Sequence, residues 1–175
     1  MGIVSFKSNS NQKTYLAVSV LGSSLKVNIK YKNISTVEVN KEISEVNITL
    51  PKEYKNKDNT QIIELSIQKM YKKIAETEIE YAMEVARHLL SFAPEDYSIK
   101  YLNEDYYKCS KSNLIISPDI VRFNREVINT TIIQAFCRLK YRYGSTKYKR
   151  MLSKAMNDYE IYYKKSSMLR ALKVS

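Results

Sequence analysis

The chain has few of the residues from which many catalytic and metal sites are built. Its 175 residues include one histidine, two cysteines and three glycines. Three glycines can hardly supply a glycine-rich phosphate loop, and two cysteines are too few for a disulfide framework or a structural zinc site. The lone histidine, His88, has no cysteine or histidine companion and is expected to be a surface residue rather than a ligand.

Long apolar runs are also missing. No run approaches the roughly 18 residues that span a bilayer, and the N-terminus lacks the apolar core of a signal peptide. Hydrophobic residues at 44% and charged residues at 27% are typical of a globular protein. We therefore expect one cytoplasmic domain over residues 1–175, with no membrane partner.

The net charge of +11 is unevenly distributed. From Phe136 to the end there are eleven lysines and arginines against two acids, a net of +9. The whole chain has 29 basic and 18 acidic residues. The first 135 residues therefore contain 18 basic and 16 acidic residues, a net charge of +2. The positive field therefore belongs to the C-terminal part.

The hydrophobic pattern predicts an α+β fold that opens with an antiparallel β-meander over residues 1–51. Apolar and polar residues alternate there, with Gly22-Ser23-Ser24 as one turn, and Pro51 ends the pattern. The strands are expected at 3–7, 14–21, 25–31, 36–40 and 45–50.

One long helix is expected next, within residues 58–93. Its apolar stripe includes Ile63, Ile67, Met70, and Tyr81 or Ala82. Asp58 and Gln61 form a candidate capping pair at its start. Short strands at 98–102, 105–110 and 114–116, within residues 98–117, would form a second sheet or extend the first.

A pair of helices is predicted over residues 125–175. The first, at 126–143, has apolar residues at three- and four-residue steps and Gly144 as its C-terminal stop. Ser145 is expected to cap the second helix. The core residues of the first are Ile128, Ile132, Ala135, Phe136 and Leu139, and those of the second are Tyr148, Met151 or Leu152, Ala155 and Tyr159.

The first of these helices follows the order of a zinc-hydrolase motif. From Val127 to Leu139 it reads V-I-N-T-T-I-I-Q-A-F-C-R-L, followed by Tyr143-Gly144-Ser145 and Tyr148. It resembles the signature V-I-D-Y-V-V-V-H-E-L-C-H-L, then N-H-S and an aromatic, of the YgjP-like metal-dependent hydrolases, relatives of SprT-type and other zincin peptidases. Upstream, Y-Y-K-C-S at 106–110 and N-L-I-I at 113–116 stand where the family has W-G-S-C-S and N-I-x-L-N. The resemblance covers roughly residues 50–158.

The resemblance implies a zincin-like fold whose metal site is lost. In the family, two histidines four residues apart and a third histidine bind Zn²⁺, and the intervening glutamate is the general base. Gln134 and Arg138 stand at the paired histidines, Ala135 at the glutamate and Gly144 at the third histidine. We therefore expect a pseudoenzyme with no catalytic residue, metal or cofactor.

The two cysteines leave two interpretations open. Each can be a small buried hydrophobic residue. Alternatively, a family-like fold could bring Cys109 and Cys137 together in one disulfide bond. A nucleophilic cysteine is not expected, because Cys137 has only His88 as a base.

The remaining positive signal is a run of cations and tyrosines near the C-terminus. Cations attract phosphates, and exposed aromatic rings stack on unpaired bases. The alternative is that the tyrosines are core residues and the lysines keep the protein soluble. The candidate nucleic-acid-binding residues are Arg138, Lys140, Arg142, Tyr143, Lys147, Tyr148, Lys149, Arg150 and Lys154.

These observations predict a catalytically inactive, metallopeptidase-like protein that binds RNA, a ribonucleoprotein or DNA through its basic C-terminal face. A second hypothesis is a protein-interaction module or inhibitor that uses the former substrate groove. A third is a hydrolase whose activity survives without zinc.

Overall fold

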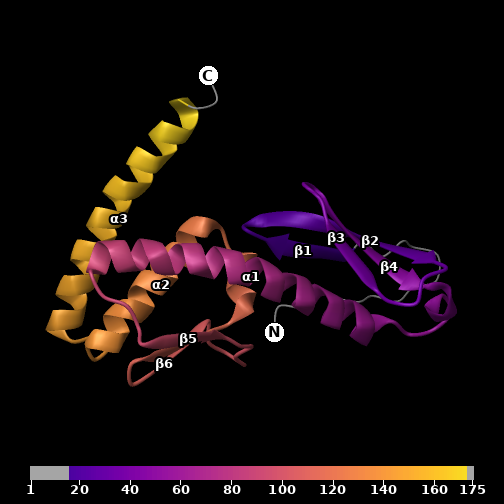
Figure 1. Cartoon of the computed structure of the whole chain (residues 1–175), viewed down its shortest axis with the longest axis horizontal. Helices are drawn as coiled ribbons and strands as arrows, with labels where there is room; N and C mark the ends of the chain where they lie inside the picture. Colours follow the sequence, from indigo (N-terminus) through magenta and orange to yellow (C-terminus); the bar gives the residue numbers. More distant parts are fainter. Residues whose placement is uncertain (1–15, 173–175) are drawn as a thin grey trace. The chain divides into compact units, whose positions relative to one another are not determined.

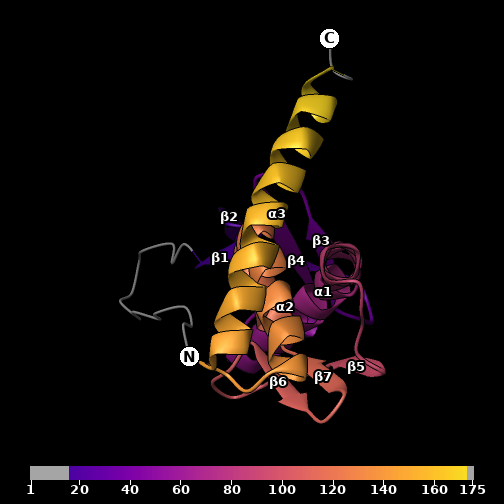
Figure 2. The ribbon, with the colours of Figure 1, turned by 90° about the vertical axis from the view of Figure 1, so that its left-hand side faces the viewer.

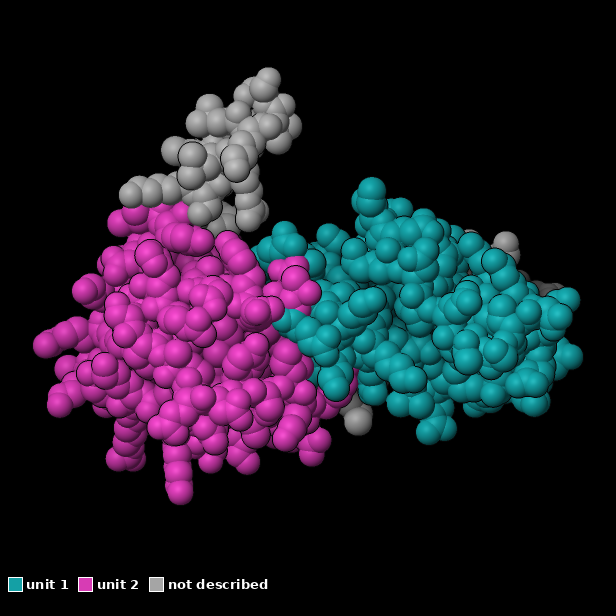
Figure 3. Space-filling view, viewed as in Figure 1, with its two compact units in different colours: residues 1–76, 118–125 teal, residues 77–117, 126–175 magenta. Residues whose placement is uncertain are grey.

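The computed structural model describes residues 16–172, so the strand expected at 3–7 lies outside the described residues. The fold is α+β, as predicted, with strands, a long helix, more strands and two helices in that order (Figure 1). It divides into two compact units (Figure 3). The first comprises the described residues up to Glu76 with Pro118–Arg125, and the second comprises Thr77–Ser117 and the chain from Glu126 onward. The assignment of the whole chain to one domain stays a prediction.

The first unit holds a four-stranded sheet of order β1-β2-β4-β3. β1 pairs with β2 and β3 with β4 in antiparallel fashion, but β2 and β4 are parallel, so the expected antiparallel meander is wrong at this pairing. Residues 46–51 of β4 are all buried, which suits a central strand, whereas β3 is short and mostly exposed, which suits an edge. The strands are β1 (Leu16–Val20), β2 (Ser23–Lys32), β3 (Glu38–Lys41) and β4 (Glu45–Pro51).

The turn between β1 and β2 consists of Leu21 and Gly22, one residue earlier than expected. Both residues have positive φ, 51° and 81°, as the type I′ hairpin turn requires. The turn lies against the short helix η2 (Pro118–Arg122), where the Leu21 amide donates to the Val121 carbonyl at 2.7 Å. A Cβ at Gly22 would come within 2.9 Å of the Asn124 Cβ. This close approach requires glycine.

The long helix α1 (Thr60–Leu90) follows the 3-10 turn η1 (Lys52–Tyr54). Asp58 caps it, as predicted, but accepts from the Thr60 amide at 3.0 Å rather than pairing with Gln61. The predicted stripe is buried at Ile63, Ile67, Met70 and Ala82, whereas Tyr81 is 39% exposed. His88 is exposed, as expected of a surface residue. No helix among residues 16–172 is long and apolar enough to cross a membrane.

The second unit has its own sheet, of order β5-β7-β6, with β5 parallel and β6 antiparallel to β7. β5 (Asp96–Ile99) begins two residues before its expected start. β6 (Tyr107–Ser110) and β7 (Asn113–Ile116) begin within two residues of their own expected starts. Two helices, α2 (Arg125–Lys140) and α3 (Thr146–Leu172), then complete the chain (Figures 1 and 2).

Helix α2 is the centre of the second unit. The predicted core residues Ile128, Ile132, Ala135 and Phe136 are at most 1% exposed, and Leu139 is half-buried. Ile133 and Cys137, outside the predicted stripe, are also fully buried. The motif helix is therefore covered on more than one side, as expected of a core helix.

Three contacts show what covers α2. The Cys109 thiol of β6 lies 3.6 Å from the Ala135 carbonyl. On α3, the Tyr159 hydroxyl accepts from Asn129 Nδ2 at 3.2 Å. The Phe92 ring, just beyond α1, lies 5.7 Å from the Phe136 ring. The helix thus contacts the small sheet, α3 and the segment after α1.

Candidate functional site

The site begins where α2 ends and the chain turns into α3. The helix ends at Lys140, so Gly144 is not its immediate stop but part of the following turn. The Ser145 amide donates to the Arg142 carbonyl at 3.1 Å, and Gly144 has a φ of 75°, as the third residue of a type II turn requires. Ser145 caps α3, as predicted, because its Oγ accepts from the Tyr148 amide at 3.2 Å.

The four positions of the family's metal site now differ from one another in environment. Gln134 is half-buried, Ala135 is fully buried, and Arg138 is exposed. Gly144 has open space around a hypothetical Cβ, but its left-handed backbone would be strained in any other L-residue. Restoring a histidine there would therefore require the turn to change conformation.

The zinc ion that the resemblance implies does not fit these residues. A guanidinium is permanently positive and has no lone pair to offer, and Gln134 supplies at best one neutral oxygen. Within residues 16–172, no group of three or more histidine, cysteine or carboxylate side chains is placed to hold a metal ion. We therefore derive no metal-dependent step for this site.

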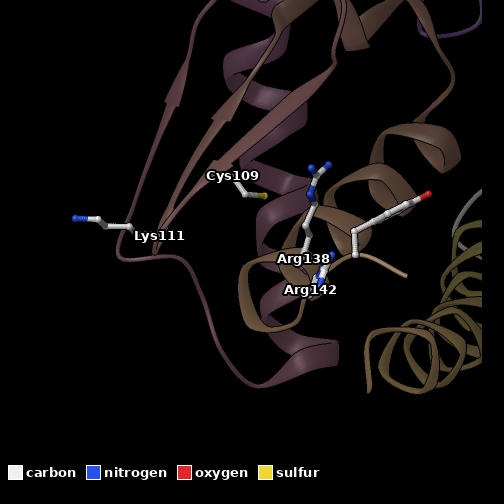
Figure 4. Close-up of a pocket in the computed structure, with 5 residues that line it drawn as sticks. Cys109, Lys111, Arg138 and Arg142 are labelled. Carbon is white, nitrogen blue, oxygen red and sulfur yellow. The ribbon is translucent and has the colours of Figure 1, made fainter. Parts of the chain in front are cut away.

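A surface hollow of about 530 Å³ lies at the C-terminal end of α2. We call it the arginine hollow; it is lined by Cys109, Lys111, Arg138, Arg142 and Tyr143. Figure 4 shows the Cys109 sulfur pointing from its strand toward Arg138, while Lys111 extends outward from the turn between β6 and β7. Its lining contains three cationic side chains and no carboxylate.

Arg138 is held in place by two tyrosines. Its guanidinium lies 5.9 Å from the Tyr107 ring and 5.5 Å from the Tyr143 ring, within cation–π range. It also hydrogen-bonds to Tyr107, and this bond raises the pKa of Arg138. These contacts fix a permanent positive charge at a position where the family has a histidine.

The cysteines supply neither a disulfide nor an activated nucleophile. Both are free thiols, so the possible Cys109–Cys137 bond is not formed. Burial raises the pKa of Cys109, with Arg138 partly opposing, and raises the pKa of Cys137 to about 11. Both are therefore protonated near neutral pH, whereas nucleophilic attack requires the thiolate.

Most of the predicted nucleic-acid-binding residues reach the surface. Tyr143 is 66% exposed, but Tyr148 is only 5% exposed. Tyr148 is therefore not available for nucleic-acid binding. Its ring centroid lies 5.3 Å from that of Tyr143, and its side chain belongs to the buried side of α3. The exposed cations, which we call the basic surface, are Arg138, Lys140, Arg142, Lys147, Lys149, Arg150 and Lys154.

Two residues that line the hollow, Cys109 and Lys111, were missing from the sequence-based candidates, as was Tyr107, which contacts Arg138. Tyr107, Cys109 and Lys111 belong to the β6–β7 hairpin. Tyr107 and Cys109 share one face of β6, since alternate strand residues point the same way. The alternation and the upstream Y-Y-K-C-S motif place these two residues on one face, but nothing in the sequence places that face beside Arg138.

Comparison with known proteins supports the resemblance and extends it. The family model described as YgjP-like, metallopeptidase domain, matches residues 5–166. The similarity therefore includes the N-terminal strands, which lie before the region of roughly residues 50–158 that the motifs indicated. No curated protein and no solved structure matches the chain. Because the family model spans far more than half of the sequence, the chain belongs to the YgjP-like metallopeptidase-domain family.

Proposed function

We propose that this chain is a catalytically inactive member of its family that binds nucleic acid, either RNA alone or within a ribonucleoprotein, or DNA, through the basic surface. One observation carries the proposal. All seven cations of that surface are exposed, and none forms an ion pair with a carboxylate among the described residues. Their charge is therefore available to an external polyanion.

The arrangement of cations on α3 also supports this proposal. Lys147, Arg150 and Lys154 follow one another at steps of three and four residues, which places them along one side of the helix. The core side chains Tyr148 and Tyr159 are buried. A helix that buries one side and carries a line of cations on the other can contact successive phosphates of a strand.

Loss of activity is inferred from the substitutions themselves. Removing the metal ligands and the general base removes the water activation on which the family's chemistry depends. The neutral thiols and the exposed, unaccompanied His88 offer no replacement base–nucleophile pair. We therefore assign a structural role to helix α2 and a binding role to the basic surface.

The purified, untagged protein is expected to contain no stoichiometric zinc. Zinc binding is expected only in the quadruple variant with Gln134→His, Ala135→Glu, Arg138→His and Gly144→His, because a zinc site of this kind needs three protein ligands, here the three histidines, and the glutamate restores only the general base. Elemental analysis by mass spectrometry measures the zinc content of each variant. The triple variant that keeps Gly144 is the matched control and should remain metal-free. One zinc per wild-type chain would contradict the expectation.

Nucleic-acid binding is tested directly by fluorescence anisotropy with labelled single-stranded RNA, single-stranded DNA and duplex DNA at low salt. All three are expected to bind, since phosphates are common to them. The single strands should bind more tightly, because the exposed Tyr143 ring can stack on an unpaired base, an effect worth about 1–3 kcal/mol. Absence of binding to all three would reject the proposal and favour a protein partner in the former substrate groove.

A further inference from the structure

The arginine hollow differs from the rest of the basic surface because it is concave and combines cations with an exposed ring. Arg138 and Arg142 come from α2 and the turn after it, Lys111 from the β6–β7 turn, and Tyr143 from beside Arg142. The fifth residue, Cys109, is a neutral thiol and does not repel an anion. The residues that line the hollow therefore favour a negatively charged ligand, whereas the corresponding site in the family binds a dication.

The donors at Arg138 are oriented before any ligand arrives. A guanidinium has five N–H donors, and the bond to Tyr107 accounts for one of them. The Tyr107 and Tyr143 rings restrict its movement, so that less side-chain freedom is lost on binding. A planar guanidinium pairs with two phosphate oxygens at once, which a lysine cannot do.

The size and chemistry of the hollow indicate one nucleotide unit. Its volume of about 530 Å³ is in the range of small-ligand sites. A phosphomonoester carries a charge of about −1.5 to −2 at neutral pH, more than the single charge of an internal phosphodiester. Two arginines complement that larger charge, and Tyr143, which is 66% exposed, offers its ring to a base.

We propose that the arginine hollow binds a nucleoside phosphomonoester, with the phosphate on Arg138 and Arg142 and the base against Tyr143. The inference rests on the proposed nucleic-acid binding, which it makes more specific: the ligand is the phosphorylated end of a strand. A free mononucleotide carries the same chemistry, and the experiment separates the two sources.

The experiment measures binding of short single-stranded oligonucleotides that differ only in whether they carry a phosphate at one end, at the other end or at neither. A terminal phosphate at one end is expected to increase affinity roughly tenfold or more, as charge-assisted hydrogen bonds do. A nucleoside monophosphate and the corresponding nucleoside are measured by calorimetry, and only the monophosphate should bind.

Arg138→Gln is expected to abolish the preference for the phosphorylated end. Lys154→Gln removes the same charge from an exposed site outside the hollow, so it should weaken all oligonucleotides and leave their affinity ratio unchanged. Circular dichroism checks that both variants are folded. Arg142→Gln, in the turn beyond α2, is the second test if Arg138→Gln fails to fold.

The outcomes separate this inference from the proposed function. Equal binding of all oligonucleotides, with no binding of the monophosphate, overturns the inference and leaves nucleic-acid binding intact. Binding of the monophosphate alone supports the hollow as a free-nucleotide site and rejects the proposed function. No binding of any ligand overturns both.

Discussion

The double substitution Lys147→Glu and Arg150→Glu is expected to weaken nucleic-acid binding by about a hundredfold at low salt. Both side chains are exposed and lie on the same side of α3, one turn apart. Losing two charge-assisted contacts costs roughly 3 kcal/mol or more, and the new carboxylates repel phosphate in addition. The loss should be similar for all sequences, because phosphate contacts position a protein without reading bases.

The matched control places the same charge change at the same spacing elsewhere. Lys69→Glu and Lys72→Glu alter two exposed lysines of α1 that lie outside the basic surface. They change the net charge equally, so a loss of affinity confined to the α3 variant identifies a local contact rather than a general effect of charge. If the wild-type protein and the α3 variant bound with equal affinity, the basic surface would not be the binding site.

The substitution Ile132→Ala is expected to lower the free energy of unfolding by about 2–5 kcal/mol. Ile132 is fully buried in α2, two residues before Gln134. Truncation removes buried methyl and methylene groups and leaves a cavity among side chains that cannot fully collapse. Chemical denaturation followed by circular dichroism measures the change.

Val127→Ala on the same helix is the control for helix propensity and loss of side-chain volume. Val127 is 39% exposed, so its truncation should change the stability by no more than about 0.5 kcal/mol. If Ile132→Ala were as mild as Val127→Ala, α2 would not be the core helix of its unit.

Hydrophobic periodicity was sufficient to place the helices and most strands. The long helix, expected within residues 58–93, spans Thr60–Leu90, and the stripe from Ile128 to Phe136 is buried. Periodicity could not identify strand partners: alternation in 45–50 fits both an antiparallel and a parallel neighbour. The burial of every residue from Val46 to Pro51, which marks β4 as central, depends on what packs against both of its faces.

The candidate site was only partly predictable. The motif register identified Arg138 and Gly144, and the charge distribution identified most of the basic surface. The hairpin residues Tyr107 and Lys111 could not be assigned to the site, because their proximity to Arg138 arises from the packing of β6 and β7 against α2. Burial of Tyr148 was predicted from the core stripe of the second C-terminal helix, and it contradicts only the assignment of this ring to nucleic-acid binding.

The buried side of α2 is largely separate from the positions that align with the family's metal ligands, since Gln134 is half-buried, Arg138 is exposed and Gly144 lies beyond the helix. The buried residues of α2 face the small sheet and α3, and they are independent of the ligand positions. Ala135 occupies the place of the catalytic glutamate in a fully buried position, where an unpaired carboxylate would be costly. The proposed loss of catalysis is therefore compatible with an intact, packed α2.

Contact between the basic surface and a polyanion is measured by the salt dependence of binding to a labelled single strand. If about four to six phosphates are neutralised, the logarithm of the association constant should fall against the logarithm of salt concentration with a slope of about −3 to −5. The Lys147→Glu, Arg150→Glu variant should lose about two units of that slope. A slope near zero for the wild-type protein, or no binding at low salt, would contradict the account.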